Sequence, residues 1–373
     1  MKKALGILGL ILVIAAGAWL IHHGSGTKAV SSENPIKIGA VLSLTGIAAS
    51  YGEPARNAMQ IAIDEINANG GIDGRPVSLT VEDDATTPAT GISAFRKLVD
   101  ADGIAGIVGG NFDFATIPLF PVADSEHVAF ISPANLRIPG GLEPSGNSFV
   151  LMPDFSKVIV GLKPYLAQSP IQKLAVVHFK STFGTQIATT LGATMTELDR
   201  GPIVDDAYTS IGNNDFRTTI IKLKQEGVDA VFLDMVDIDP VTFLTQARNL
   251  DYHPTVISYY GIIDSFGAPT ADKTLLEGVV VLDWESSSAR FQQLYQKRYG
   301  VLATHTAEKS YESIYVMAHA IAATKNLADV APYLATHSFE TPSGTVSFNK
   351  DHAIDTTPVK IEVVKDGNLI PLF

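Results

Sequence analysis

The sequence contains no cysteine and comparatively few basic residues. Without cysteine the chain forms no disulfide, carries no lipid-modified amino-terminal cysteine and has no thiolate nucleophile. Its 27 Lys and Arg are outnumbered by 39 Asp and Glu, which gives a formal net charge of -12 at pH 7. We see no Lys/Arg cluster, and counterion release from nucleic acid needs a basic face. The composition therefore argues against nucleic acid or an anionic membrane surface as the main partner.

Motifs of enzymes are also missing. The sequence has no Gly-x-Ser-x-Gly elbow, no His-Glu-x-x-His helix and no phosphate-binding Walker loop. Glu82-Asp83-Asp84 suggests a cation site, but carboxylates at the end of a strand usually meet water or cap a turn, and EF-hand spacing is absent. We therefore expect no enzymatic activity, no catalytic residue, no cofactor and no metal site.

Residues 1–34 predict export. Lys2 and Lys3 precede an apolar run, Ala4 to Ile21, as in a secretory signal. The small residues 16–18 fit a cleavage site, yet the run is also long enough for a retained membrane anchor, and both alternatives stay open. The remainder, residues 22–34, is rich in Gly, Ser and Lys and indicates a flexible tether. We expect a periplasmic protein, cleaved or anchored, that is not a lipoprotein.

The chain that follows predicts an α/β fold. With 373 residues and 46% hydrophobic content it can bury more than one core. Residues 36–42 form an apolar, β-branched run typical of a buried strand. Apolar residues at helical spacing start near Pro54, and a second strand is expected from Val77. Strand, helix and strand make a βαβ unit, which indicates a parallel sheet.

The same order of parts occurs twice. Residues 173–177 resemble residues 37–41, and both strands lead into a polar loop with an aromatic-Gly pair, Phe183-Gly184 or Tyr51-Gly52. Farther on, residues 227–232 resemble residues 103–108. The match extends over four strands and predicts two similar lobes. At the end of the chain we expect two β segments, 345–348 and 359–364, and a hairpin at Asp366-Gly367-Asn368.

Several short motifs resemble one family. They are residues 38–46, Tyr51-Gly52, Asp64-Glu65-Ile66-Asn67 with Gly70-Gly71-Ile72-Asp73-Gly74, Asp83-Asp84, residues 131–134, 176–178 with Phe183-Gly184, 246–248, 276–278 and 344–348. In this order they resemble the type I periplasmic solute-binding proteins, and most closely the branched-chain amino-acid (Leu/Ile/Val) receptors of ABC transporters. The resemblance covers nearly all of the chain after the export segment.

The resemblance implies a clamshell of two Rossmann-like lobes joined by three hinge crossovers. We expect one lobe from residues 36–152 and 284–344, and the other from 153–283 and 345–373. A monomer of this kind would capture a small organic ligand as its lobes close and deliver it to an ABC permease in the inner membrane. The alternative is a membrane-tethered ligand-sensing or scaffold domain that uses the same fold without transport.

In the first lobe the resemblance implies ligand contacts at the ends of strands. Tyr51 matches an aromatic that covers the ligand, although it could also pack on the following helix. The loop with Phe112, Asp113 and Phe114 matches a carboxylate-binding loop, but an Asp there repels a carboxylate. Either main-chain amides still bind an anion, the ligand presents a donor, or Asp113 caps the helix. The pair Ala134-Asn135 matches a position whose carbonyl contacts an amino group.

In the second lobe Phe183 matches an aromatic that is usually tyrosine. Tyr260 matches the glutamate that neutralises a ligand ammonium, so this chain lacks that carboxylate. Asp237, with Asp234 and Asp239 in the same loop, could replace it, or these residues could be a solvated loop or a helix cap. The expected ligand is amino-acid-like, or an aromatic or apolar carboxylate or amide, and whether it is an α-amino acid stays open.

Overall fold

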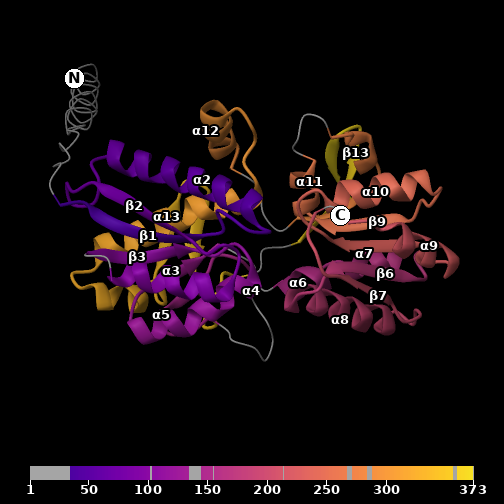
Figure 1. Cartoon of the computed structure of the whole chain (residues 1–373), viewed down its shortest axis with the longest axis horizontal. Helices are drawn as coiled ribbons and strands as arrows, with labels where there is room; N and C mark the ends of the chain where they lie inside the picture. Colours follow the sequence, from indigo (N-terminus) through magenta and orange to yellow (C-terminus); the bar gives the residue numbers. More distant parts are fainter. Residues whose placement is uncertain are drawn as a thin grey trace, which may run out of the picture.

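The computed structural model describes residues 34–100, 103–133, 144–153, 155–212, 214–266, 271–283, 288–355 and 359–372. The export segment and tether expected over residues 1–34 lie outside these ranges except for Asn34. The described chain forms two α/β lobes that lie side by side (Figure 1). None of the helices in the described ranges is long and apolar enough to cross a membrane.

The first lobe is built on a parallel sheet of five strands in the order β2-β1-β3-β4-β5. The central β3 is buried throughout, and its neighbour β1 is buried at every position except Lys37, as expected for strands covered on both faces. The strands are β1 (Ile36–Leu42), β2 (Val77–Asp83), β3 (Ile104–Gly109), β4 (Phe130–Ser132) and β5 (Ser148–Val150).

Helices from distant parts of the chain cover this sheet. The first group follows its strands directly, and the second group comes after β10 of the second lobe, near the end of the chain (Figure 1). The helices are α2 (Ala49–Ala68), α3 (Pro88–Asp100), α4 (Asp113–Thr116), η1 (Ile117–Leu119), α5 (Phe120–Glu126), α12 (Ala289–Tyr299), α13 (His305–Ala323), η3 (Leu327–Asp329) and α14 (Val330–Leu334).

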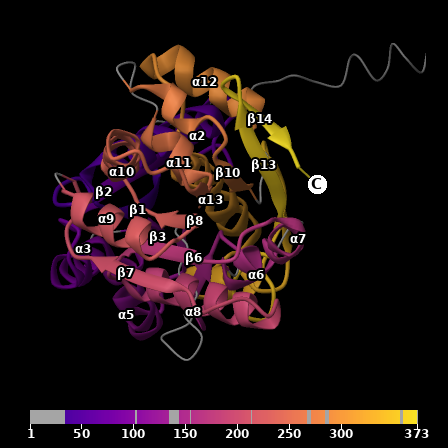
Figure 2. The ribbon, with the colours of Figure 1, turned by 90° about the vertical axis from the view of Figure 1, so that its right-hand side faces the viewer.

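The second lobe has a seven-stranded sheet in the order β14-β13-β10-β9-β8-β6-β7. Strands β6 to β10 run parallel, whereas β13 pairs antiparallel with both β10 and β14. Figure 2 looks onto this lobe, with yellow β13 and β14 at one edge of the sheet. The strands are β6 (Leu174–Phe179), β7 (Val204–Tyr208), β8 (Ala230–Asp234), β9 (Thr255–Tyr259), β10 (Val280–Asp283), β13 (Lys360–Lys365) and β14 (Asn368–Pro371).

The helices of the second lobe alternate with its parallel strands. α8 begins where Ser181 accepts a hydrogen bond from Gly184 N (3.0 Å), a side-chain cap that satisfies one free amide of the first turn. The helices are α6 (Phe155–Val160), α7 (Lys163–Gln168), α8 (Thr182–Glu197), α9 (Arg217–Gln225), α10 (Asp239–Asn249), α11 (Gly261–Ser265) and η2 (Lys273–Leu276).

The repeat expected from the sequence is confirmed by the strand orders. The first four strands of one lobe are arranged β2-β1-β3-β4, and those of the other β7-β6-β8-β9, which is the same pattern. The predicted final hairpin is also present, because Lys365 pairs with Asn368 across Asp366-Gly367. Both turn residues have positive φ, at 50° and 74°, which suits a tight two-residue hairpin.

The chain passes between the lobes three times: after β5, between β10 and α12, and before β13. The last crossing lies later than the expected boundary at residue 344. β12 (Gly344–Ser347) pairs with β11 (Ser338–Thr341), and the Phe348 ring packs 5.0 Å from that of Phe149 in the first lobe. Ala353 also pairs with Val150 of β5. Residues 345–355 therefore lie with the first lobe, and residues 359–372 join the second.

The acidic family motif near the end of α2 holds the first lobe together. Glu65 accepts hydrogen bonds from the hydroxyls of Tyr311 (2.5 Å) and Tyr315 (2.9 Å) and pairs with Arg290, so it joins α2 to α12 and α13. Asn67 donates to the carbonyl of Val77 (2.8 Å) and accepts from its N–H (2.7 Å). These residues of the motif are structural, because their partners all lie within the lobe.

Asp83, at the end of β2, has a similar structural role. Its carboxylate accepts hydrogen bonds from the N–H groups of Leu44 (2.9 Å) and Ala85 (2.8 Å) and from the N–H and hydroxyl of Thr45. Asp84 accepts from Thr86 N (2.7 Å). The acidic cluster therefore fixes the loop between β1 and α2, as carboxylates that cap turns do.

α2 starts five residues earlier than Pro54, the residue expected in its first turn. The helix begins at Ala49, so Tyr51 and Gly52 belong to its first turn and Pro54 lies inside it. A Cβ at Gly52 would lie 2.0 Å from the carbonyl oxygen of Ser43. Glycine therefore lets the start of the helix pack directly against the loop backbone, an approach that a side chain would prevent.

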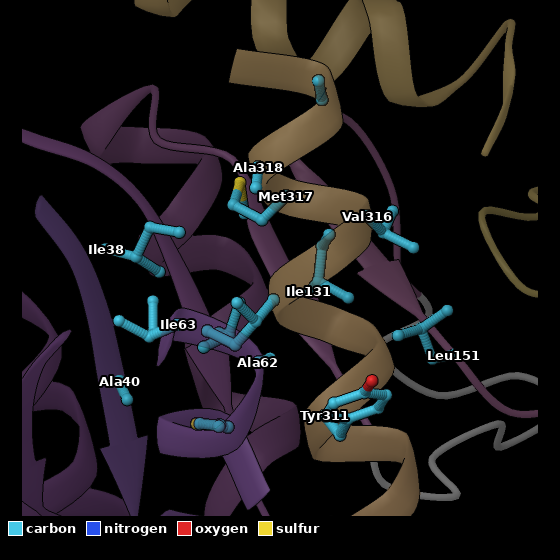
Figure 3. Packing of buried hydrophobic residues seen from close by; sticks show 14 of the residues in the cluster. Ile38, Ala40, Ala62, Ile63, Ile131, Leu151, Tyr311, Val316, Met317 and Ala318 are labelled. Carbon is cyan, nitrogen blue, oxygen red and sulfur yellow. The ribbon is translucent and has the colours of Figure 1, made fainter. Parts of the chain in front are cut away.

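α13 is the helix that closes the core of the first lobe. Its residues Met317 and Ala318 lie on the side of Ile38 of β1 and Ile63 of α2, and Val316 lies on the side of Leu151 (Figure 3). A Cβ at Gly106 of β3 would lie only 2.4 Å from the sulfur of Met317. The small residue on the strand therefore makes room for the long one on the helix, as close-packed interiors require.

Gly106→Ala is expected to destabilise the protein by about 1–3 kcal/mol through overpacking against Met317. In a Met317→Ala background the same change should cost much less, because the crowded sulfur is gone. Urea unfolding of the four proteins of this cycle measures the coupling. Gly192→Ala in α8 is the control, since its Cβ would meet Ile203 at an ordinary 3.7 Å. Equal effects of Gly106→Ala in both backgrounds would contradict the packing account.

Candidate ligand-binding cleft

A cavity of about 140 Å³ lies where the carboxyl ends of the two parallel sheets face each other. Both lobes contribute to its wall, because the loops after parallel strands gather at one edge of each sheet. Five aromatic rings and three carboxyl groups dominate the lining, together with His305 at the start of α13. The rings and carboxyls are those of Tyr51, Phe112, Phe179, Phe183, Tyr259, Asp113, Asp234 and Asp264.

Tyr51 contacts both lobes. Its ring packs edge-on against Phe112 of the first lobe, with ring centroids 5.3 Å apart. Its hydroxyl accepts a hydrogen bond from the main-chain N–H of Asp237 in the second lobe (3.3 Å). Burial raises the pKa of Tyr51, and the charges of Asp264, Asp237 and Asp234 raise it further. The Tyr51 hydroxyl therefore lies within the electrostatic influence of three carboxyl groups of the second lobe.

Asp113 bridges the lobes through main-chain hydrogen bonds. Its Oδ1 accepts from Phe114 N in its own helix α4 (2.8 Å), and its Oδ2 accepts from Phe183 N in the first turn of α8 (3.2 Å). Burial raises the pKa of Asp113, although the same two N–H groups favour its charged form. The cap expected at Asp113 is not formed, because Phe112 is the N-cap of α4 and Asp113 is its first residue; the Asp113 side chain instead reaches the opposite lobe.

Two further carboxyls lie in the second lobe. Asp234, at the end of β8, accepts a hydrogen bond from the hydroxyl of Tyr259 on β9 (2.9 Å). Asp264, in α11, accepts from His305 N of the first lobe (3.2 Å). Burial is the main cause that raises the pKa of each to about 7. Burial also lowers the pKa of His305 to about 3, so its imidazole is neutral at pH 7.

Only some of the residues predicted as ligand contacts line the cavity. Tyr51, Phe112, Asp113 and Phe183 line the cavity. Phe114 lies beside it, where its ring meets Phe179 of the other lobe at 6.2 Å and lines a shallow neighbouring hollow. Ala134 and Asn135 lie outside the described residues.

The remaining predictions fall just outside the cavity. The Tyr260 ring is directed to His305, with centroids 5.9 Å apart, and does not belong to the described lining. Asp237 contributes its main-chain N–H rather than its side chain. Asp239 is buried and accepts from Gly212 N (3.1 Å) and from the Asn214 side chain, so it ties down a loop. Of the three acids in this loop, only Asp234 lines the cavity.

Sequence reasoning missed Phe179, Tyr259, Asp264 and His305. Phe179 and Tyr259 are the last residues of β6 and β9, so the rule that sites follow the ends of parallel strands points to them directly. Asp264 is a turn farther along, and His305 enters only after the chain has returned to the first lobe. No local pattern marks these last two, because their proximity results from the packing of the two lobes.

The profile of the periplasmic binding protein family matches residues 35–368. This match covers most of the chain, which therefore belongs to the periplasmic binding protein family. Leu/Ile/Val-binding protein BraC3 of Rhizobium johnstonii is 32% identical over 230 residues. That alignment covers 61% of this chain and 62% of the relative, so it spans less than two thirds of that protein's length.

Solved structures share the fold. LivJ of Streptococcus pneumoniae in complex with isoleucine has a TM-score of 0.77 and 22% identity, and the match covers 91% of this chain and 99% of LivJ. A solute-binding protein of an ABC transporter from Rhodopseudomonas palustris, in complex with 3,4-dihydroxybenzoic acid, has a TM-score of 0.78 and 22% identity, with 91% and 97% covered. These likenesses confirm the two-lobed fold expected from the resemblance.

The buried carboxyl of Asp234 predicts a pH-dependent stability. Its folded pKa of about 7 exceeds the unfolded value of 3.8, so its contribution is fully present below pH 3.8 and is lost as the pH rises to about 7. Asp234→Asn mimics the protonated group. Its free energy of unfolding relative to wild type should therefore rise by about 2–3 kcal/mol between pH 5 and pH 8.

Urea unfolding at both pH values measures this change without a ligand. Asp215→Asn is the control, because hydrogen bonds from Arg217 lower the pKa of Asp215 to about 2 and leave it ionised at both pH values. A constant difference between Asp234→Asn and wild type would contradict the assigned pKa.

Asp113→Ala should weaken the contact between the lobes, because it removes the acceptor of Phe183 N. A hydrogen bond to a charged group contributes about 1.5–3 kcal/mol, so the ligand-free protein should shift measurably toward separated lobes. Small-angle X-ray scattering should then give a larger radius of gyration. Asp215→Ala, which removes an exposed carboxylate from the second lobe, controls for charge. Identical scattering of Asp113→Ala and wild type would rule out a bridging role.

Proposed function

We propose that this chain is an extracytoplasmic solute-binding protein that captures a small organic ligand between its lobes and delivers it to an ABC permease. The observation that carries the proposal is the cavity between the lobes, which is lined by residues of both. A ligand in such a cavity touches both halves of the molecule at once. It therefore favours the arrangement in which the lobes meet over the one in which they are apart.

The hydrogen bonds between the lobes support this mechanism. Tyr51 accepts from Asp237 N, Asp113 from Phe183 N, and Asp264 from His305 N, so each bond joins a side chain of one lobe to the backbone of the other. All of them surround the cavity. Closure therefore completes the binding site, and the closed surface is what a permease would recognise.

The lining supports a ligand with an apolar or aromatic body. Phe183 packs 4.8 Å from Phe155 and meets Tyr259 edge-on, so the wall of the second lobe is a connected aromatic group. Amino-acid-like ligands and aromatic or apolar carboxylates or amides are the classes expected from the sequence. The named ligands of two similar structures, isoleucine and 3,4-dihydroxybenzoic acid, fall within this range.

We propose a binding role rather than a catalytic one, in keeping with relatives that are named as binding proteins. The protein would act as a monomer in the periplasm, exported through residues 1–34 and, in the absence of cysteine, not as a lipoprotein.

A second candidate is a membrane-tethered sensor, favoured by the length of the apolar run Ala4 to Ile21. The mass of the mature protein separates the two, since only the tethered form retains that run.

A panel of amino acids, aromatic acids, amides, short carboxylates and amines should contain a ligand that raises the melting temperature. A ligand at a hundred times its Kd stabilises the folded state by about 2.7 kcal/mol, which thermal shift detects readily. Tyr51→Ala, which removes a wall residue and a contact between the lobes, should weaken the response. Tyr333→Ala removes a tyrosine of α14 outside the cavity lining and is the control. No response to any class, with no binding to a permease, would reject transport.

A further inference from the structure

We propose that the cavity binds an organic cation, an ammonium group on an apolar or aromatic body, rather than a ligand that carries a carboxylate. This inference rests on the solute-binding function proposed above and names its ligand class. Four features of the cavity support it: the charges of its lining, the use of its amide donors, the free acceptor capacity of two carboxyl groups and its aromatic wall.

The charged side chains of the described lining are all acidic. Asp113, Asp234 and Asp264 contribute carboxyl groups, and neither Lys nor Arg lines the cavity within the described residues. The imidazole of His305 is neutral at pH 7 because burial lowers its pKa. At pH 8, above the pKa of about 7 of Asp234 and Asp264, a buried anionic ligand would meet their carboxylates without a compensating charge from any side chain of the described lining, which is costly in a desolvated site.

Two main-chain amide donors beside the cavity already have an acceptor. The N–H groups of Phe114 and Phe183 lie at the starts of helices from opposite lobes, and both donate to the carboxylate of Asp113. Asp113 thus occupies, with its own carboxylate, the kind of position in which a ligand carboxylate would be held. A ligand carboxylate would have to displace the Asp113 side chain from these two N–H groups, and it would then lie next to the charge of Asp113.

Asp234 and Asp264 keep capacity for a ligand. Within the described residues each receives one hydrogen bond, from the Tyr259 hydroxyl and from His305 N respectively. A carboxylate accepts about four hydrogen bonds, so both can accept more. An ammonium supplies donors and positive charge together, and it would stabilise the ionised form of both groups.

The aromatic wall is suited to the same ligand. Tyr51 and Phe112 form one edge-on pair, and Phe183 and Tyr259 form another in the opposite lobe. The faces of such rings attract a desolvated cation, and they also bind an apolar body. This combination of rings and carboxyls is favourable for an alkyl- or arylammonium ion and offers little to a carboxylate.

Asn111 adds one neutral donor. It is 9% exposed, lines the cavity, and its Nδ2 has no hydrogen-bond partner within the described chain. Its Oδ1 accepts from Ser43 N (3.3 Å), which fixes the orientation of the amide. A ligand hydroxyl or carbonyl could accept from Nδ2, but a single amide does not offset the charge of a carboxylate.

A bare metal ion fits this cavity less well. The described ranges contain no group of three or more His, Asp or Glu side chains positioned to hold one metal ion. The three carboxyls of the lining come from different elements, Asp113 from α4, Asp234 from β8 and Asp264 from α11. An organic ligand can place an ammonium group beside a carboxyl and its body against the neighbouring rings.

Three probes with the same aromatic body test the proposal: 2-phenylethylamine, L-phenylalanine and 3-phenylpropionate. Isothermal titration of the full chain at pH 8 should give the tightest binding for the amine, by at least about tenfold over the zwitterion, and no measurable binding of the acid. The same order should hold for 3-methylbutylamine, L-leucine and 4-methylpentanoate.

Substitutions of single carboxyl groups test which of them bind the cation. Asp234→Asn and Asp264→Asn should each weaken amine binding by at least about tenfold, because each removes one charge from the cavity. Asp206→Asn, on β7 of the same lobe and paired with Lys222 outside the cavity, should bind like wild type. Circular dichroism and thermal unfolding establish that the variants are folded before their affinities are compared.

The possible outcomes separate this inference from the function on which it rests. If an acid or a zwitterion binds as tightly as its amine, the cation proposal is wrong, but capture of a solute stands. Amine binding that is unchanged in both variants would also overturn the proposal. If none of the six probes binds, the cation class is rejected, whereas the proposed function fails only when the whole panel and the permease give no response.

Discussion

The geometry of a parallel sheet determines where this protein can bind anything. All strands of β1 to β5 end at one edge, as do β6 to β10, and the lobes are joined so that these edges face each other. Tyr51 follows β1, Asp113 follows β3, and Asp234 ends β8. Loops leave a parallel sheet only at its ends, so the carboxyl-end loops of both sheets supply nearly all the side chains of the cavity.

The features of the fold and of the cavity that could be predicted from the sequence are those encoded by residues close together in the chain. The repeated strand order and the Asp366-Gly367 hairpin are encoded by neighbouring residues and were predicted correctly. The residue at the end of β9 shows the limit, since Tyr259 lines the cavity and Tyr260, one position on, points to His305. Tyr259 is the last residue of β9, whereas Tyr260 already has helical dihedral angles as the N-cap of α11, so a shift of one position changes which side chain lines the cavity.

Nonlocal features could not be predicted in this way. Asp264 meets His305 only because the chain returns to the first lobe, and residues 345–355 stay there because Phe348 packs on Phe149. The motifs that identify the family are mostly structural, as Glu65 and Asn67 illustrate by bonding within the first lobe. A resemblance carried by such residues identifies the scaffold reliably and leaves the chemistry of the cavity undetermined.

The acidity of the cavity has a consequence for transport. If a permease recognises the closed surface, a closed protein without ligand would compete with the ligand-bound protein for the permease. It would bind there without delivering a ligand. Closure without a ligand is opposed by three carboxyl groups, those of Asp113, Asp234 and Asp264. Burial raises the pKa of each, which means that it destabilises their charged forms. The hydrogen bonds between the lobes favour closure, while the desolvated acids disfavour it until a ligand compensates them. In the proposed role, the carboxyl groups that select the ligand would also make closure of the lobes depend on whether the ligand is bound.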